Sequence, residues 1–214
     1  MNEAIQVWQG KVAEHVVAQL KQRNFEACFI PDAGATREKI LKLIPDEAVV
    51  YRVGSMTMHT LGIWEALEKR PGIQVINPFE SGLSEAENIE NRRQGLLADV
   101  LLCSSNAITL DGRLVNLDGS GNRVAGLMFG PRKVILAIGL NKLVSSLEDA
   151  FSRIRNFTAP ANCIRVEAKT PCVKTGLCTD CRGVERRCNK WSIIEGSKYP
   201  GRINILLVGE HLGY

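Results

Sequence analysis

The sequence predicts an α/β fold in which helices flank a mostly parallel sheet. Short apolar runs rich in β-branched residues alternate with helical patterns over most of the 214 residues, which is typical of α/β proteins. The chain is 45% hydrophobic and 23% charged, as expected for a globular protein whose core needs no disulfides. No apolar run reaches the roughly 18 residues of a membrane-spanning helix. We expect one domain over residues 1–214, with residues 158–200 as a cysteine-rich, metal-binding loop within it.

The chain begins with an amphipathic helical pattern. Ile5, Trp8, Val12, Val16 and Leu20 recur at helical spacing, so we expect a helix whose apolar face packs on the domain or on a partner. Its polar face mixes charges of both signs, which disfavours a helix lying on a membrane surface. The segment also lacks the uninterrupted apolar stretch of a signal peptide, so we expect the protein in the cytoplasm.

The remaining elements follow in order along the chain. The apolar runs expected as buried strands are Ala27–Ile30, Ala48–Val53, Ile73–Ile76, Asp99–Cys103, Lys133–Ile138 and Asn204–Val208. Helices are expected at Arg37–Leu43, Met58–Lys69, Ser84–Leu97, Val124–Phe129 and Ser146–Arg155. Between Ala107–Leu110 and Arg113–Leu117 stands Asp111-Gly112, a favoured turn pair, which predicts an inserted β-hairpin.

Four of the seven cysteines are clustered with the spacing C-x5-C-x2-C-x6-C, and these predicted metal ligands are Cys172, Cys178, Cys181 and Cys188. In a reducing compartment, clustered thiols bind metal or do redox chemistry more often than they form structural disulfides. Four thiolates without a neighbouring histidine suit an iron–sulfur cluster, a 4Fe-4S cluster first, or a tetrahedral zinc ion. The spacing matches no standard ferredoxin or zinc ribbon, so free thiols or redox disulfides stay open as a third alternative.

Basic residues surround this cluster and would offset the negative charge of a metal–thiolate centre; they are Lys174, Arg182, Arg186, Arg187 and Lys190. The same basic run could instead be a solvated face or a docking patch for an acidic partner. The other three cysteines, Cys28, Cys103 and Cys163, are isolated in the sequence. We expect them to be small buried core residues.

Two polar loops follow predicted strands and are candidates for ligand binding. The first contains Gly54, Ser55 and Thr57, where an anion could meet the start of a helix; alternatively, a hydroxyl there only caps that helix. The second loop contributes Asp118, Gly119, Gly121, Asn122 and Arg123. A guanidinium can hold a carboxylate or phosphate through two hydrogen bonds, although these side chains could also serve only the turn backbone.

We expect both loops to form one site, because ligands of α/β sheets bind at the carboxyl ends of the strands. Asn106 and Thr109, at the start of the hairpin, are assigned to the same site. Neither loop matches a Walker motif or a dinucleotide-binding glycine motif. His59, near the first loop, is expected to be an ordinary helix residue, and no catalytic residue is assigned.

The stretch SSNAITLDGRLVNLDGSGNRVAGLMFGPRKVILAIGLNKLV resembles the signature of the lactate-utilisation (LUD) domain family. VGSMT with LGIWEAL, and later FSRIRNFTAPANCIRV, TPCVKTGLCTDC and ILLVGEHLGY, are also similar to that family, so the resemblance extends from about Val7 to Tyr214. The resemblance implies a fold related to the NagB/RpiA/CoA-transferase-like group. It also implies a link to bacterial L-lactate oxidation, in a system that contains iron–sulfur subunits.

Ten positions match the polar motifs of the family: Gly54, Ser55, Thr57, Asn106, Asp118, Gly119, Gly121, Asn122, Arg123 and Asn141. The cysteine cluster marks a subgroup of such proteins rather than the domain in general. The resemblance transfers no catalytic mechanism.

Three functions remain open. The first is a protein of lactate or related organic-acid metabolism that binds a small carboxylate or phosphate, carries the four-cysteine site and meets iron–sulfur redox proteins. The second is an isomerase-like or transferase-like enzyme acting on a sugar phosphate or CoA thioester, by analogy of fold. The third is a non-enzymatic interaction module stabilised by metal. The net charge of +4 gives no reason to expect nucleic acid, no membrane partner is expected, and the oligomeric state is not predicted.

Overall fold

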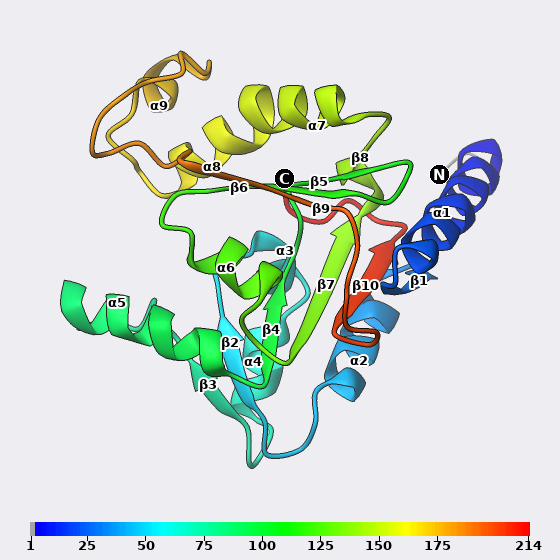
Figure 1. Cartoon of the computed structure of the whole chain (residues 1–214), viewed down its shortest axis with the longest axis horizontal. Coiled ribbons are helices and arrows are strands. Elements are labelled where there is room, and N and C mark those ends of the chain that lie inside the picture. The colour runs from blue at the N-terminus through cyan, green and yellow to red at the C-terminus, as the bar shows by residue number, and fades with distance from the viewer. Residues whose placement is uncertain (1–2) are drawn as a thin grey trace.

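The centre of the protein is a parallel β-sheet. The structure is a computed structural model that describes residues 3–214, and within that range six strands pair in the order β1-β10-β7-β4-β2-β3. Their bounds in this order are Glu26–Ile30, Ile203–Val208, Lys133–Gly139, Val100–Cys103, Val49–Arg52 and Gln74–Ile76. Every neighbouring pair in this sheet is parallel (Figure 1). The predicted α/β class with a mostly parallel sheet is therefore confirmed.

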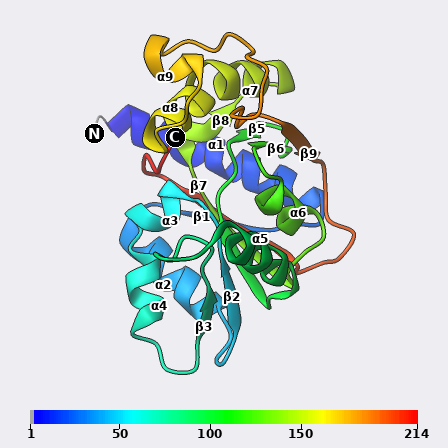
Figure 2. The same cartoon turned by 90° about the vertical axis from the view of Figure 1, so that its left-hand side faces the viewer.

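Helices cover both faces of this sheet, as Figure 2 shows edge-on. On one face lie α2 (Ala33–Leu43), α3 (Met56–Thr60) and α4 (Ile63–Glu68). On the other lie α1 (Glu3–Gln22), α5 (Glu85–Gln94) and α6 (Asn122–Met128), with a short 3-10 turn, Gly95–Leu97, after α5.

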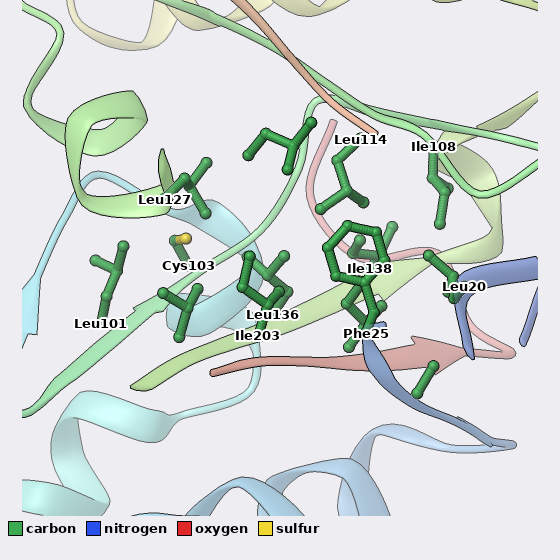
Figure 3. Close-up of a cluster of buried hydrophobic side chains, with 14 of the residues drawn as sticks. Leu20, Phe25, Leu101, Cys103, Ile108, Leu114, Leu127, Leu136, Ile138 and Ile203 are labelled. Carbon is green, nitrogen blue, oxygen red and sulfur yellow. The ribbon is translucent and has the colours of Figure 1, made fainter. Parts of the chain in front are cut away.

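The strand sequences explain this layering. In β7, Val134, Leu136 and Ile138 belong to the apolar cluster under α1 and α6, whereas Ile135 and Ala137 belong to the cluster under α2–α4. Successive side chains of a strand point to opposite faces, so an uninterrupted apolar run fits a strand buried on both sides. Figure 3 shows the first cluster, in which side chains from α1, α6 and the β-hairpin meet the strands.

A smaller second sheet lies above the first. Within the described residues its order is β8-β5-β6-β9, with bounds Leu143–Val144, Ala107–Thr109, Leu114–Asp118 and Lys190–Ile194. β5 and β6 form the predicted hairpin. The hairpin is not a peripheral insertion, because β6 also pairs antiparallel with β9 and β5 pairs with β8. One face of this sheet packs on the main core, and the other packs on α7 (Leu147–Arg153) and the segment after it.

Two expectations about the elements need correction. The helix expected over Met58–Lys69 is two helices, because Gly62 adopts a left-handed backbone (φ 62°) between α3 and α4. Residues 158–200 are not one loop: they contain α8 (Ala159–Arg165), α9 (Pro171–Thr175) and β9. The chain reaches α8 from α7 through a π-helical turn, Ile154–Thr158.

The first helix is present as predicted, and the domain covers part of its apolar face. Its predicted face is buried at Val16 and Leu20, but Trp8 is 60% exposed and Ile5 is exposed as well, so the domain covers only the second half of that face. Residues 1 and 2 of this predicted helix lie outside the described residues. None of the helices in the described part of the chain combines the length and apolar character needed to cross a bilayer.

Candidate functional site

A cavity of about 280 Å³ opens at the carboxyl ends of β2 and β4, between the two sheets. Its walls come from the loops after β2, β4 and β6, from α8 and from the C-terminal Tyr214. The sequence-predicted residues that line it are Gly54, Ser55, Thr57, Asn106, Asp118, Gly119, Asn122 and Arg123. The structure thus brings both polar loops to one place, although their role in ligand binding stays a prediction.

The first loop meets local structural needs as well as lining the cavity. Ser55 caps α3, because its hydroxyl oxygen accepts a hydrogen bond from the Met58 amide at 3.3 Å. Thr57 is buried, and its hydroxyl donates to the carbonyl of Leu212 in the C-terminal segment at 3.2 Å. The loop therefore ties the end of β2 to the end of the chain.

Arg123 holds the loops of the cavity together. Its Nη1 donates to Asn116 Oδ1 at 2.7 Å, and its Nη2 donates to Asn106 Oδ1 and to the Leu117 carbonyl, both at 2.9 Å. Its Nε lies 3.5 Å from Asp118 Oδ2, and its side chain is 12% exposed. Because all three nitrogens contact protein groups, Arg123 acts here as a positioning residue for three loop segments. The expected two-bond grip on an anion would need some of these contacts to be exchanged.

Three predicted ligand-binding residues do not line the cavity. The Thr109 hydroxyl serves the hairpin turn, where it bonds Asp111 and accepts from the Arg113 amide. Gly121 starts α6 in a left-handed conformation (φ 96°) and donates its amide to Asp118. Asn141 holds the C-terminal segment: its Nδ2 donates to the Gly213 carbonyl at 3.1 Å, and its Oδ1 accepts from the Leu212 amide at 3.2 Å.

Lys142 lines the cavity and was missed by sequence reasoning. Lys142 ends a short 3-10 turn, Leu140–Lys142, that connects β7 to β8, and the residue is 3% exposed. The ammonium donates to Thr57 Oγ1 and to Ser104 Oγ, both at 3.0 Å, and among the described residues no carboxylate lies within salt-bridge distance. Burial, together with the nearby Arg153 and Arg123 guanidiniums, lowers the pKa of Lys142 to about 7. Its position shortly after a predicted buried strand could have identified Lys142 as a site residue. Lysines at such positions usually extend into solvent, so the sequence gives no reason to expect a buried one.

The cavity carries an excess of positive charge. Among the described residues its basic lining consists of Arg92, Arg123, Lys142, Arg165 and Arg187, whereas Asp118 is its only acidic side chain and is engaged by Arg123. Arg92 donates to Ser120 Oγ at 2.7 Å, and its buried Nε has no hydrogen-bond partner among the described residues. Arg165 donates to the Tyr214 hydroxyl at 2.6 Å. This balance favours an anionic ligand.

The cysteine cluster forms a second, smaller hollow beside the cavity. Cys172, Cys178, Cys181 and Cys188 all line it, and so does Cys163. Cys163 is buried on α8, as expected for a core residue, but it is not isolated. Burial raises its pKa to about 12. Cys163 and Cys188 also line the large cavity, so the two sites share a wall.

The basic residues around this hollow differ in part from those predicted. Arg186 and Arg187 line it, and so does Arg155 from the π-helical turn. Arg186 donates to the carbonyls of Cys181 and Cys188, and both Arg155 and Arg186 pair with Asp180. Lys174 and Arg182 do not line the hollow, and Lys190 instead donates to the Gly119 carbonyl.

The thiols of the hollow are suitable ligands for a soft metal, but they are not arranged around one metal position. Thiolates are the ligands that iron–sulfur clusters and structural zinc prefer, and cationic guanidiniums nearby suit an anionic centre. No three His, Cys, Asp or Glu side chains of residues 3–214 are placed so that they could hold one metal ion together. The thiols are therefore gathered around one hollow without converging on a single point.

Comparisons with known proteins agree with this architecture. The chain is similar to the crystal structure of a DUF162 family protein from Deinococcus radiodurans, with 16% sequence identity and a TM-score of 0.52. The match covers 94% of this chain and 98% of that one, and at this identity it supports the fold alone. A search of curated proteins finds no significant match. The family model of the LUD domain matches residues 13–208, which is most of the chain. The chain therefore belongs to the LUD domain family, a family related to lactate utilisation.

Proposed function

We propose that the cavity binds a small organic acid through its carboxylate. The observation that carries this proposal is Lys142, a buried cation with hydroxyl partners and no carboxylate partner in the described structure. A buried charge is unfavourable unless it is paired, and the anion of a ligand would supply the missing partner. The relation of the family to lactate utilisation favours a hydroxy acid or oxo acid of that size.

The surrounding side chains support the same ligand class. Arg92 and Arg165 add positive charge, while Asn122 and Ser120 offer neutral hydrogen-bond groups for a hydroxyl or carbonyl of the ligand. Charge-assisted hydrogen bonds of this kind are about twice as strong as neutral ones. A cavity of about 280 Å³ is at the lower end of small-molecule sites, which fits a small acid.

Titration calorimetry with lactate and with lactamide tests the proposal, because the two ligands differ only in the charged group. We expect lactate to bind and lactamide to bind at least tenfold more weakly. Arg92→Ala should weaken lactate binding, whereas Arg93→Ala, which changes an exposed neighbour paired with Glu90, should not. Equal binding of lactate and lactamide, or no binding of either, would contradict the proposal.

Phosphorylated ligands are the alternative for the same site. A sugar phosphate or CoA thioester would also bring negative charge to the cationic lining, as expected for an isomerase-like or transferase-like enzyme. The same titration with glucose 6-phosphate and CoA separates the alternatives. Tighter binding of either compound than of lactate would replace the organic acid as the ligand.

We propose second that Cys172, Cys178, Cys181 and Cys188 hold a metal centre, with an iron–sulfur cluster before zinc. The supporting observation is that these four thiols line one hollow next to Arg155 and Arg186, and metal binding would draw them together on one centre. An iron–sulfur cluster would supply one-electron transfer, with iron–sulfur redox proteins as partners, whereas zinc would only hold the segment in place. With zinc at this position, the protein would be a metal-stabilised interaction module.

Elemental and acid-labile sulfide analysis of anaerobically purified protein tests this second proposal. We expect iron and sulfide in the wild type, loss of both in Cys178→Ser, and retention in Cys28→Ser, which changes a cysteine on β1 outside the hollow. Zinc without sulfide would select the structural alternative. Protein without bound metal would contradict the proposal and leave free thiols or redox disulfides.

A further inference from the structure

The amine of Lys142 occupies an unusual position for a lysine that only binds an anion. It lies at the inner wall of the cavity, with Thr57 Oγ1 and Ser104 Oγ each at 3.0 Å. The C-terminal backbone covers it, since a Cβ on Gly213 would lie 3.4 Å from Nζ. Two of the three donors of an ammonium are thus used, and the described residues provide no acceptor for the third.

The environment of Lys142 disfavours the charged ammonium, so that a neutral fraction of the amine is present at pH 7. Arg123 and Arg153 are the charged groups that act on it most strongly after burial itself, and both disfavour a further positive charge. Lysines that are desolvated or placed near other cations are activated as nucleophiles towards carbonyl groups, because the free electron pair of the amine is then available at neutral pH. With a pKa of about 7, about half of the Lys142 side chains are uncharged at pH 7. The charged fraction pairs with a bound carboxylate, and the uncharged fraction presents its free electron pair to the bound acid.

We propose that Lys142 forms an imine with the carbonyl group of a small 2-oxo acid bound in the cavity. This inference rests on the proposed binding of small organic acids and names the substrate class and the reacting atom. It adds a covalent step that binding alone does not need.

The step is balanced without any oxidant or reductant. The Nζ electron pair forms a bond to the carbonyl carbon, and the π electrons of the C=O bond move to oxygen. A proton passes from nitrogen to that oxygen, for which the hydroxyls of Thr57 and Ser104 are the adjacent relay groups. The nitrogen electron pair then forms the C=N bond as the C–O bond breaks, and the second N–H proton passes to the departing oxygen, so that water leaves and a neutral imine remains. The carboxylate of the substrate stays intact.

Trapping with sodium borohydride tests this step, because reduction converts an imine into a stable secondary amine. The wild-type protein is incubated with pyruvate and borohydride, and the modified peptide is identified by mass spectrometry. We expect one pyruvate-derived adduct per chain, on Lys142. Lactate, which has no carbonyl to react, should give no adduct under the same conditions.

Two variants keep the outcome interpretable. Lys142→Arg retains a cation but cannot form the imine, so it should give no adduct, whatever its affinity for lactate. Ser104→Ala keeps the amine and should be trapped at least several-fold more slowly than the wild type. Exchange of the pyruvate methyl protons in D2O, followed by NMR, gives a second readout, since an imine acidifies the adjacent carbon; this exchange should be lost in Lys142→Arg.

The results separate the inference from the function on which it rests. If pyruvate and lactate bind but Lys142 is not labelled, or if label is spread over exposed lysines such as Lys69 and Lys198, the imine is wrong and acid binding stands. If neither acid binds in the titration, both proposals are wrong. Labelling confined to Lys142 supports both.

Discussion

The amine of Lys142 and the hydroxyl of Thr57 lie 3.0 Å apart, although 85 residues separate them along the chain. Lys142 follows β7 and Thr57 follows β2, and these two strands flank β4, whose end supplies Ser104. The parallel order of the sheet places the three loops at one edge. A buried amine, two hydroxyls and a cavity are thus the direct consequence of the strand order.

Lys142 makes the stability of the protein depend on pH in a defined direction. Its pKa is about 7 in the folded chain and lies near its usual value of 10.5 when unfolded, so between these pH values the unfolded chain binds more protons. The free energy of unfolding should therefore rise with pH over this window, by up to about 1.4 kcal/mol per pH unit. Urea unfolding from pH 7 to 10 measures it. In Lys142→Met this contribution should be missing. If the free energy of unfolding changed with pH in the same way in the wild type and in Lys142→Met, the assigned pKa would be contradicted.

Replacing Arg123 should lower the free energy of unfolding, because Arg123 connects the loops of the cavity. Arg123→Ala leaves Asn106, Asn116 and Asp118 without their guanidinium partner, and we expect a loss of about 2–4 kcal/mol in the free energy of unfolding. Arg92→Ala, at the cavity wall, should cost less than about 1 kcal/mol. Denaturant unfolding compares them. Equal stability of the two variants would show that Arg123 does not organise the loops.

Asn141 should affect ligand binding without lining the cavity. Asn141→Ala removes both hydrogen bonds that its side chain makes to Leu212 and Gly213, and so releases the segment that carries Tyr214 to the cavity. We expect a several-fold weaker affinity for lactate, measured by calorimetry, and a stability loss of about 1–2 kcal/mol. Wild-type affinity in a folded Asn141→Ala protein would mean that the C-terminal segment plays no part in binding.

Gly95 allows the close approach of Tyr51 that orients Asn122. A Cβ at position 95 would lie 2.2 Å from the Tyr51 ring, which is fully buried and whose hydroxyl accepts a hydrogen bond from Asn122 Nδ2 at 2.8 Å. Gly95→Ala should therefore lower the free energy of unfolding by about 1–3 kcal/mol. A melting curve checks this. Gly10→Ala is the control, since beyond its chain neighbours and the nearby backbone of its own helix no described atom lies within 4 Å of an added Cβ there. Equal effects would contradict the steric explanation.

The sequence predicts elements best where a local pattern is enough. β7 contains the apolar run Val134–Ile138 and β10 the apolar run Ile205–Val208, and both lie within the core as expected. β8 and β9 were not predicted, because β8 has two residues and β9 is half exposed; their pairing with β5 and β6 depends on segments far away in the chain. The break at Gly62 was missed since the apolar pattern continues through it.

The site follows the same division. Polar loops after strands identified eight residues that line the cavity, because the carboxyl ends of parallel strands meet at one edge. Lys142 was missed since its burial depends on the C-terminal segment folding back over it. Cys163 lies nine residues before Cys172, outside the motif, and only the turn from α8 to α9 brings it to the shared hollow.

Proton uptake on ligand binding tests the central claim most directly, namely that the buried Lys142 amine gains its counter-ion from a bound carboxylate. Because its pKa is about 7, binding of lactate at pH 7 should draw about half a proton per site as the amine becomes fully charged. Calorimetric titration in buffers of different ionisation enthalpy measures this number. We predict about half a proton for the wild type and none for Lys142→Met. Lactate binding with no proton uptake, or with the same uptake in both proteins, would contradict the account.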